Sequence, residues 1–153
     1  MALENIAPIS VDLRTPDNRM DIIKGIEKLN TQDEKLAAGV SCEQGDWLVL
    51  DGSGHLVAPT STAVANTYPI WEGNDQYDAM ATGNGTILVS GGFLYRTSKF
   101  APGSYTVGMN LTVKDLGNGE KVPSQAGSGD PVLCRVYKIA DAKGVMTIEV
   151  LNR

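Results

Sequence analysis

Residues 45–59 read GDWLVLDGSGHLVAP, and this stretch decides the fold. Its WLVL segment consists of residues that favour a pleated, partly buried strand. The Asp-Gly-Ser-Gly of residues 51–54 supplies turn conformations that glycine adopts without a Cβ clash. Leu56 and Val57 then begin a return strand, which Pro59 ends. The stretch therefore predicts a β-hairpin.

A second stretch, residues 108–123, repeats these features as GMNLTVKDLGNGEKVP. It keeps the opening Gly, an apolar strand, an Asp at the turn entrance, a Gly-x-Gly tip and a Val-Pro exit. Two further strands are predicted at residues 132–139 and 145–151, joined by an Asp-Ala-Lys-Gly turn. The two similar hairpins predict related elements on opposite sides of one barrel or sandwich.

Two apolar runs flank the glycine pair at positions 91 and 92. These runs, residues 87–89 and 93–95, either pair with each other as a hairpin or form one strand that is kinked by a glycine bulge. The preceding residues 58–85 are expected to contain one strand and one long loop.

Composition agrees with a mainly β fold. The chain has 153 residues, of which 17 are Gly and 7 are Pro, so turn signals occur along its whole length. Charged residues make up only 20%, against about 25% in typical soluble domains. We expect residues 21–153 to form a single β-rich domain.

The first 20 residues differ from the rest, because isolated apolar residues are separated by prolines. They predict an extended N-terminal arm that gains order by lying on another surface. Residues 21–38 are compatible with one short helix, since isoleucines recur at helical spacing, but the β-branched side chains leave a strand as the alternative. The residues that give the arm its character are Leu3, Ile6, Pro8, Ile9, Val11 and Leu13.

Charge and cysteine content exclude some classes of protein. A net charge of −5 argues against binding to nucleic acid, which requires clustered Lys and Arg. No apolar stretch is long enough to cross a bilayer, and the N-terminus lacks the pattern of a signal peptide, so we expect no membrane partner and synthesis in the cytoplasm. We expect Cys42 and Cys134 to be two buried free thiols, and a disulfide between them is the alternative.

No catalytic or metal-binding pattern stands out, so the sequence predicts a protein without enzymatic activity, metal or cofactor. Asp51, Ser53 and His55 alternate within one turn, where they do not adopt the geometry of a hydrolase triad. The glycine clusters lack the Lys-Ser/Thr of a phosphate-binding loop. An acidic loop offers oxygen ligands without the spacing of a calcium-binding loop; its members are Glu72, Asn74, Asp75 and Asp78.

The chain nevertheless resembles the head decoration, or cement, proteins of tailed bacteriophages. The resemblance lies in the proline-punctuated N-terminal arm and covers most of residues 36–140, including LAAGVSCEQGDWLVLDGSGHLVAP and GGFLYRTSKFAPGSYTVGMNLTVKDLGNGEKVP, and it continues into a strand pair that begins PVLCRVYKI. It implies a small barrel-like or tulip-shaped β domain, often a homotrimer, on the exterior of the capsid in the virion. It also implies that the arm adds to a neighbouring subunit of the major capsid protein.

A different class of protein remains as the alternative. Tyr68, Trp71 and Tyr77 could provide the stacking platform of a carbohydrate-binding or adhesion module built on a β-sandwich. This alternative predicts exposed, coplanar aromatic rings.

Overall fold

The computed structural model describes residues 19–73, 83–90 and 92–151, and these residues are almost entirely strands and turns. The mainly β fold class is therefore confirmed. Eleven strands lie within the described residues, together with one turn of 3₁₀ helix, Ile26–Lys28. The strands are β1 (Asp21–Lys24), β2 (Asn30–Leu36), β3 (Trp47–Leu50), β4 (His55–Val57), β5 (Thr67–Glu72), β6 (Asn84–Ser90), β7 (Phe93–Thr97), β8 (Asn110–Val113), β9 (Pro123–Gln125), β10 (Cys134–Lys138) and β11 (Met146–Val150).

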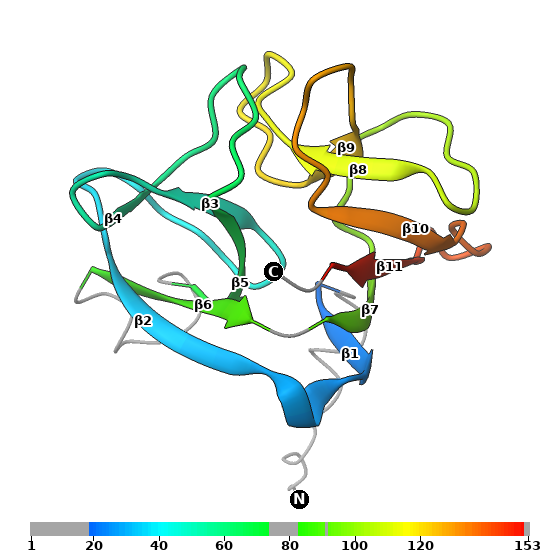
Figure 1. The fold of residues 1–153 in the computed structure, drawn as a ribbon, viewed down its shortest axis with the longest axis horizontal. Helices are drawn as coiled ribbons and strands as arrows, with labels where there is room; N and C mark the ends of the chain where they lie inside the picture. Colours follow the sequence, from blue (N-terminus) through cyan, green and yellow to red (C-terminus); the bar gives the residue numbers. More distant parts are fainter. Residues whose placement is uncertain (1–18, 74–82, 91, 152–153) are drawn as a thin grey trace, which may run out of the picture.

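The strands form two sheets that stand side by side (Figure 1). One is a closed barrel with the strand order β2-β4-β3-β5-β6, in which β6 pairs back with β2. The other is a six-stranded sheet with the order β1-β7-β11-β10-β8-β9. Every pairing is antiparallel except that of β2 with β4. The expected barrel is thus present, with an open sheet beside it.

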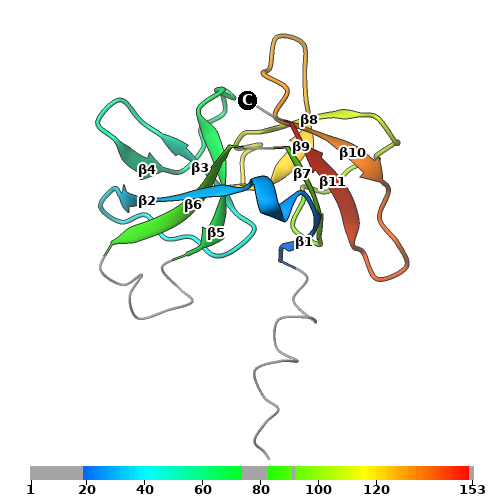
Figure 2. The same cartoon turned by 60° about the horizontal axis from the view of Figure 1, so that its bottom comes forward.

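One antiparallel ribbon passes from the barrel into the open sheet. Along one side the chain runs through β1 and then β2, and along the other through β6 and then β7 (Figure 2). The two sides meet closely at Gly25, where an added Cβ would lie 2.8 Å from the carbonyl oxygen of Gly92. Gly25 also has a φ of +92°, which favours glycine. The close approach of the two sides therefore requires a residue without a Cβ at position 25.

The ribbon corrects two expectations. The helix considered for residues 21–38 is wrong, because Ile22 packs into the core from a strand and only Ile26–Lys28 forms a helical turn. The strand alternative is confirmed, in keeping with β-branched side chains. The runs on either side of positions 91 and 92 do not pair with each other, since β6 belongs to the barrel and β7 to the open sheet.

Both predicted hairpins are confirmed as antiparallel pairs, β3 with β4 and β8 with β9. In each one an aspartate closes the turn: an oxygen of Asp51 accepts two backbone N–H bonds of 2.9 Å, and one of Asp115 accepts two of 2.8 Å. The turn that matches the first hairpin most closely is at Asp141, between β10 and β11. There the carboxylate of Asp141 accepts hydrogen bonds from the backbone N–H groups two and four residues later, as that of Asp51 does. The backbone N–H of Asp141 also donates to the carbonyl four residues later, which again matches Asp51.

Two hydrophobic clusters hold the sheets. The smaller lies within the barrel and contains Leu48, Leu56 and Cys42. The larger lies under the open sheet, yet it includes Trp47 and Leu88 from strands of the barrel, so the two sheets share this core. Cys134 belongs to the larger cluster, which separates it from Cys42. Both thiols are buried and form no disulfide, as the favoured interpretation predicted.

Candidate functional site

The predicted capsid-binding residues lie outside the described part of the chain. What the structure describes is the point where this N-terminal segment joins the fold, at Arg19 and Met20. We call this junction the root of the segment. The residues that lie outside are Leu3, Ile6, Pro8, Ile9, Val11 and Leu13.

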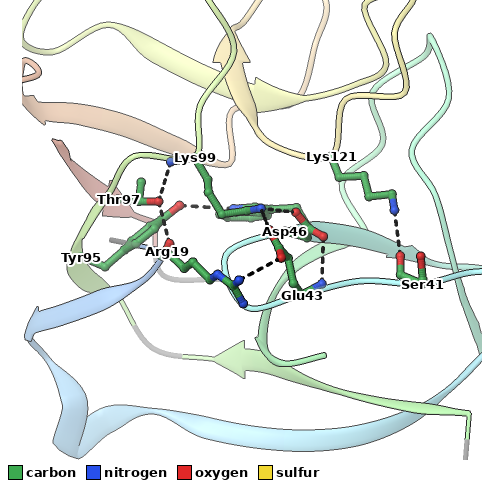
Figure 3. Close-up of polar contacts among 9 residues, drawn as sticks. Arg19, Ser41, Glu43, Asp46, Tyr95, Thr97, Lys99 and Lys121 are labelled. Atoms are coloured by element: carbon green, nitrogen blue, oxygen red, sulfur yellow. Dashed lines mark hydrogen bonds and ion pairs between the residues drawn. The ribbon is translucent and has the colours of Figure 1, made fainter. Parts of the chain in front are cut away.

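Backbone contacts fix the root against the core. The hydroxyl of Thr97 donates a 2.6 Å hydrogen bond to the carbonyl oxygen of Arg19, and its oxygen accepts a 2.9 Å bond from the N–H of Lys99 (Figure 3). Met20 is buried in the shared cluster. The backbone of Arg19 can lie this close to position 45 because Gly45 has no side chain: an added Cβ would lie 2.5 Å from the carbonyl oxygen of Arg19. These contacts therefore hold the root against the core.

An ion-pair network surrounds the root. The Nζ of Lys99 lies 2.5 Å from Oε1 of Glu43 and 3.0 Å from Oδ1 of Asp46, and Nη2 of Arg19 lies 3.4 Å from Oε2 of Glu43 (Figure 3). The side chains of Lys99 and Asp46 are only 18% and 10% exposed. The network thus joins the root to the loop that precedes β3.

The charge state of Lys99 determines what this network can do. Burial by itself lowers the pKa of Lys99, but the hydrogen bond to Glu43 and the charge of Asp46 outweigh it and raise the pKa above its ordinary value. A lysine with a raised pKa stays protonated at neutral pH, so it is a poor nucleophile or general base. The network is suited to holding the root in place and not to covalent chemistry.

The loop before β3 receives its shape from the same residues. An oxygen of the Asp46 carboxylate accepts a 2.9 Å bond from the N–H of Glu43, and the N–H of Ile70 donates a 2.7 Å bond to the carbonyl of Asp46. Lys121 crosses from the β8–β9 connection and donates to the carbonyl of Ser41 at 2.7 Å (Figure 3). The opening residues of the first hairpin therefore lie where both sheets and the root meet.

A buried aromatic pair lies beside the network. The indole N–H of Trp47 donates a 3.3 Å hydrogen bond to the hydroxyl of Tyr95, and both side chains are fully buried. Burial raises the pKa of Tyr95, with a further contribution from Cys134, so its hydroxyl stays neutral. This pair links the barrel to the open sheet.

The other candidate residues do not gather into a site. Tyr68 packs against the barrel cluster, whereas Trp71 packs against the shared cluster, so the two rings do not form one stacking platform. Tyr77 lies outside the described residues, as do Asn74, Asp75 and Asp78 of the acidic loop.

The turn that holds Asp51, Ser53 and His55 has a structural role. The carboxylate of Asp51 accepts hydrogen bonds from the backbone N–H groups of Ser53 and His55. Among the described residues, no three His, Cys, Asp or Glu side chains are grouped so as to hold a metal ion.

Local sequence patterns do not reveal the network at the root. Lys99 and Glu43 are 56 positions apart, and neither belongs to a recognisable motif. The one local signal is Gly45-Asp46 before the apolar run, and it indicates the start of a hairpin and not an ion-pair network.

Comparison of the chain with protein-family models, with curated proteins and with solved structures finds no match. Within the described residues there is no helix that is long and apolar enough to cross a bilayer.

Proposed function

We propose that this chain is a non-enzymatic structural protein of a bacteriophage virion, which binds the exterior of the capsid and stabilises the shell. The observation that carries the proposal is the way the root of the N-terminal segment is held against the core. A sequence with isolated apolar residues emerges at Arg19 from a point that is fixed by Thr97, by Gly45 and by the ion pairs to Glu43.

A fixed root favours the capture of a partner by this segment. In the proposed complex, the segment adds as a strand to the sheet of a neighbouring major capsid protein, and its apolar residues fill pockets there. Because the root is already ordered, less conformational entropy is lost on binding than for a segment that starts in a loose loop. Many copies on a symmetric shell then add avidity to individually modest contacts.

Binding to shells tests the proposal. In the full-length chain, Ile6→Asp, Ile9→Asp and Val11→Asp together should weaken cosedimentation with expanded shells of the major capsid protein from the same genome. We expect a loss of affinity of more than about ten-fold, because charges would have to enter apolar pockets. The control is Leu116→Asp, which places a charge on an exposed loop. Unchanged binding of the triple variant would remove the segment from the mechanism.

The number of copies that associate is a separate question. The resemblance implies a homotrimer, and the mass of the chain in solution, measured by sedimentation equilibrium, tests this number.

A further inference from the structure

The turn between β8 and β9 contains one of the two Asn-Gly dipeptides of the chain, Asn118-Gly119. Asparagine is a thermolabile residue, because its side-chain amide is lost by reaction with the backbone nitrogen of the next residue. A following glycine favours this reaction, since glycine has no side chain to shield its nitrogen. Asn118 is exposed, so water reaches it. The turn therefore carries a candidate site of covalent modification.

The reaction requires the backbone nitrogen of Gly119 to act as a nucleophile. This nitrogen loses its proton and attacks Cγ of Asn118, which closes a cyclic imide. The bond from Cγ to the side-chain nitrogen breaks, and that nitrogen takes up a proton and leaves as ammonia. Water then opens the ring and gives aspartate or isoaspartate, so no oxidant or reductant takes part. The rate thus depends on how firmly the N–H of Gly119 is held.

The N–H of Gly119 is engaged in the structure. It donates a 2.8 Å hydrogen bond to Oδ1 of Asp115, and the same oxygen accepts a second 2.8 Å bond from the N–H of Gly117. A hydrogen bond to a carboxylate is stronger than one between neutral groups. The negative charge of Asp115 also repels the negative charge that develops on the nitrogen of Gly119. Both effects oppose the attack on Asn118.

Asp115 carries its charge wherever the reaction is fast. The backbone N–H bonds from Gly117 and then Gly119 are the largest causes that lower its pKa below 3.8. A backbone N–H loses its proton more often as the pH rises, and throughout that range Asp115 is ionised.

A second carboxylate binds other N–H groups of the same turn. Oε1 of Glu120 accepts 3.0 Å hydrogen bonds from the N–H groups of Leu116 and Asn118. Glu120 therefore restrains the backbone before the reacting bond, whereas Asp115 holds the nitrogen that attacks. The two carboxylates have separable effects, and Glu120 provides a matched control.

The ends of the turn are anchored independently of the Asp115 side chain. The backbone N–H of Asp115 donates a 2.8 Å hydrogen bond to the carbonyl of Thr60, and the carbonyl of Lys121 accepts a 2.7 Å bond from the N–H of Trp47. Shortening the side chain of Asp115 leaves both backbone bonds possible. Its effect on Asn118 is therefore expected to be local.

The other Asn-Gly dipeptide lies in a different setting. Asn84 is half-buried in β6 and pairs with Lys35 of β2. Gly85 is buried, and an added Cβ would lie 3.3 Å from Cδ1 of Leu56. Ring closure at Asn84 would distort a strand of the closed barrel. Modification of Asn84 consequently reports unfolding of the barrel and serves as an internal reference.

We propose that Asn118 is the position at which this chain undergoes spontaneous deamidation, and that the Asp115 carboxylate slows the reaction by holding the N–H of Gly119. The product adds a third carboxylate to a turn that already contains two, so it weakens the turn by repulsion. The inference does not depend on binding to a capsid, because the rate at Asn118 is measured on the chain alone.

Incubation of the folded, full-length chain at mildly alkaline pH tests the proposal. Trypsin cleaves after Lys114 and Lys121 and releases residues 115–121, in which chromatography with mass spectrometry separates the asparagine, aspartate and isoaspartate forms. Asp115→Ala should deamidate at Asn118 about five-fold faster than the wild type, through loss of one charged hydrogen bond. Asp115→Asn, which keeps an accepting oxygen without the charge, should lie between them.

Glu120→Ala is the control for a loosened turn, because it removes two N–H bonds and leaves the bond between Gly119 and Asp115. It should accelerate the reaction less than Asp115→Ala does. Equal rates in these two variants, or no acceleration in Asp115→Ala, would overturn the role of Asp115. Modification of Asn84 ahead of Asn118 in the wild type would overturn the assignment of the site. A parallel rise at Asn84 in Asp115→Ala would show unfolding of the barrel and contradict a local effect.

Discussion

Gly45 is the residue on which the close passage of the root depends. Its φ is +92°, and an added Cβ would lie 2.5 Å from the oxygen of Arg19 and 2.7 Å from Cδ of Lys99. A larger residue would therefore disturb the Arg19 backbone and the ion pairs of Lys99 together. The first prediction concerns this position.

The variant Gly45→Ala should be destabilised by about 2–4 kcal/mol, which combines a strained backbone with a displaced neighbour. Gly39→Ala is the matched control: its φ is +81°, and nothing lies within 4 Å of the added Cβ. It should lose only about 1 kcal/mol. Urea unfolding of both variants measures the difference. Equal losses would show that the root does not constrain Gly45.

At this scale the sequence predicts little of the site. It places Gly45 at the opening of the first hairpin, because glycine before an apolar run is a local signal. It does not identify Lys99 and Glu43 as partners, because their 2.5 Å contact depends on how two distant segments pack. Long-range side-chain contacts of this kind leave no periodic trace in the chain.

At the scale of elements, the hairpins are predictable because their information is local. An aspartate at a turn entrance accepts backbone N–H bonds two and four residues later, and this occurs at Asp51, Asp115 and Asp141. The ribbon that joins the sheets is not predictable in the same way. Its strands β2 and β6 are far apart in sequence, and the isoleucines near Gly25 suit helix and strand patterns alike.

These turns predict a dependence on acid. Each of the three aspartates has a pKa below its ordinary value of 3.8. The largest cause is a hydrogen bond from a backbone N–H, which belongs to His55 for Asp51, to Gly117 for Asp115 and to Val145 for Asp141. A carboxyl with a lowered pKa in the folded state contributes stability above its unfolded pKa. That contribution is lost as the pH falls through the folded pKa.

The triple variant with asparagine at the three turn positions should therefore lose less stability than the wild type between about pH 5 and pH 2.5. Asparagine still offers an oxygen that accepts the same bonds but carries no charge. Melting temperatures across this range measure the effect, and Asp21→Asn, whose carboxylate closes none of these turns, is the control. Parallel pH profiles for the wild type and the triple variant would contradict the explanation.

At the scale of the whole molecule, the shared core predicts that the barrel and the open sheet unfold as one cooperative unit. Trp47 is a barrel residue, yet it packs in the cluster under the open sheet and donates a 3.3 Å bond to Tyr95 there. The alternation of β3 separates the two cores, because Leu48 faces the barrel cluster while Trp47 faces the shared one. Disruption of either core should therefore weaken both sheets.

Leu48→Ala in the barrel and Ile148→Ala under the open sheet should each cost about 2–4 kcal/mol of unfolding free energy, because both side chains are fully buried. Each variant should still unfold in one transition, with tryptophan fluorescence and far-ultraviolet circular dichroism coincident. Leu116→Ala, at an exposed position, should change stability by less than about 0.5 kcal/mol. If Leu48→Ala instead separated the transition into two, the barrel would be able to unfold while the sheet remained, and the Trp47–Tyr95 contact would be too weak to couple them.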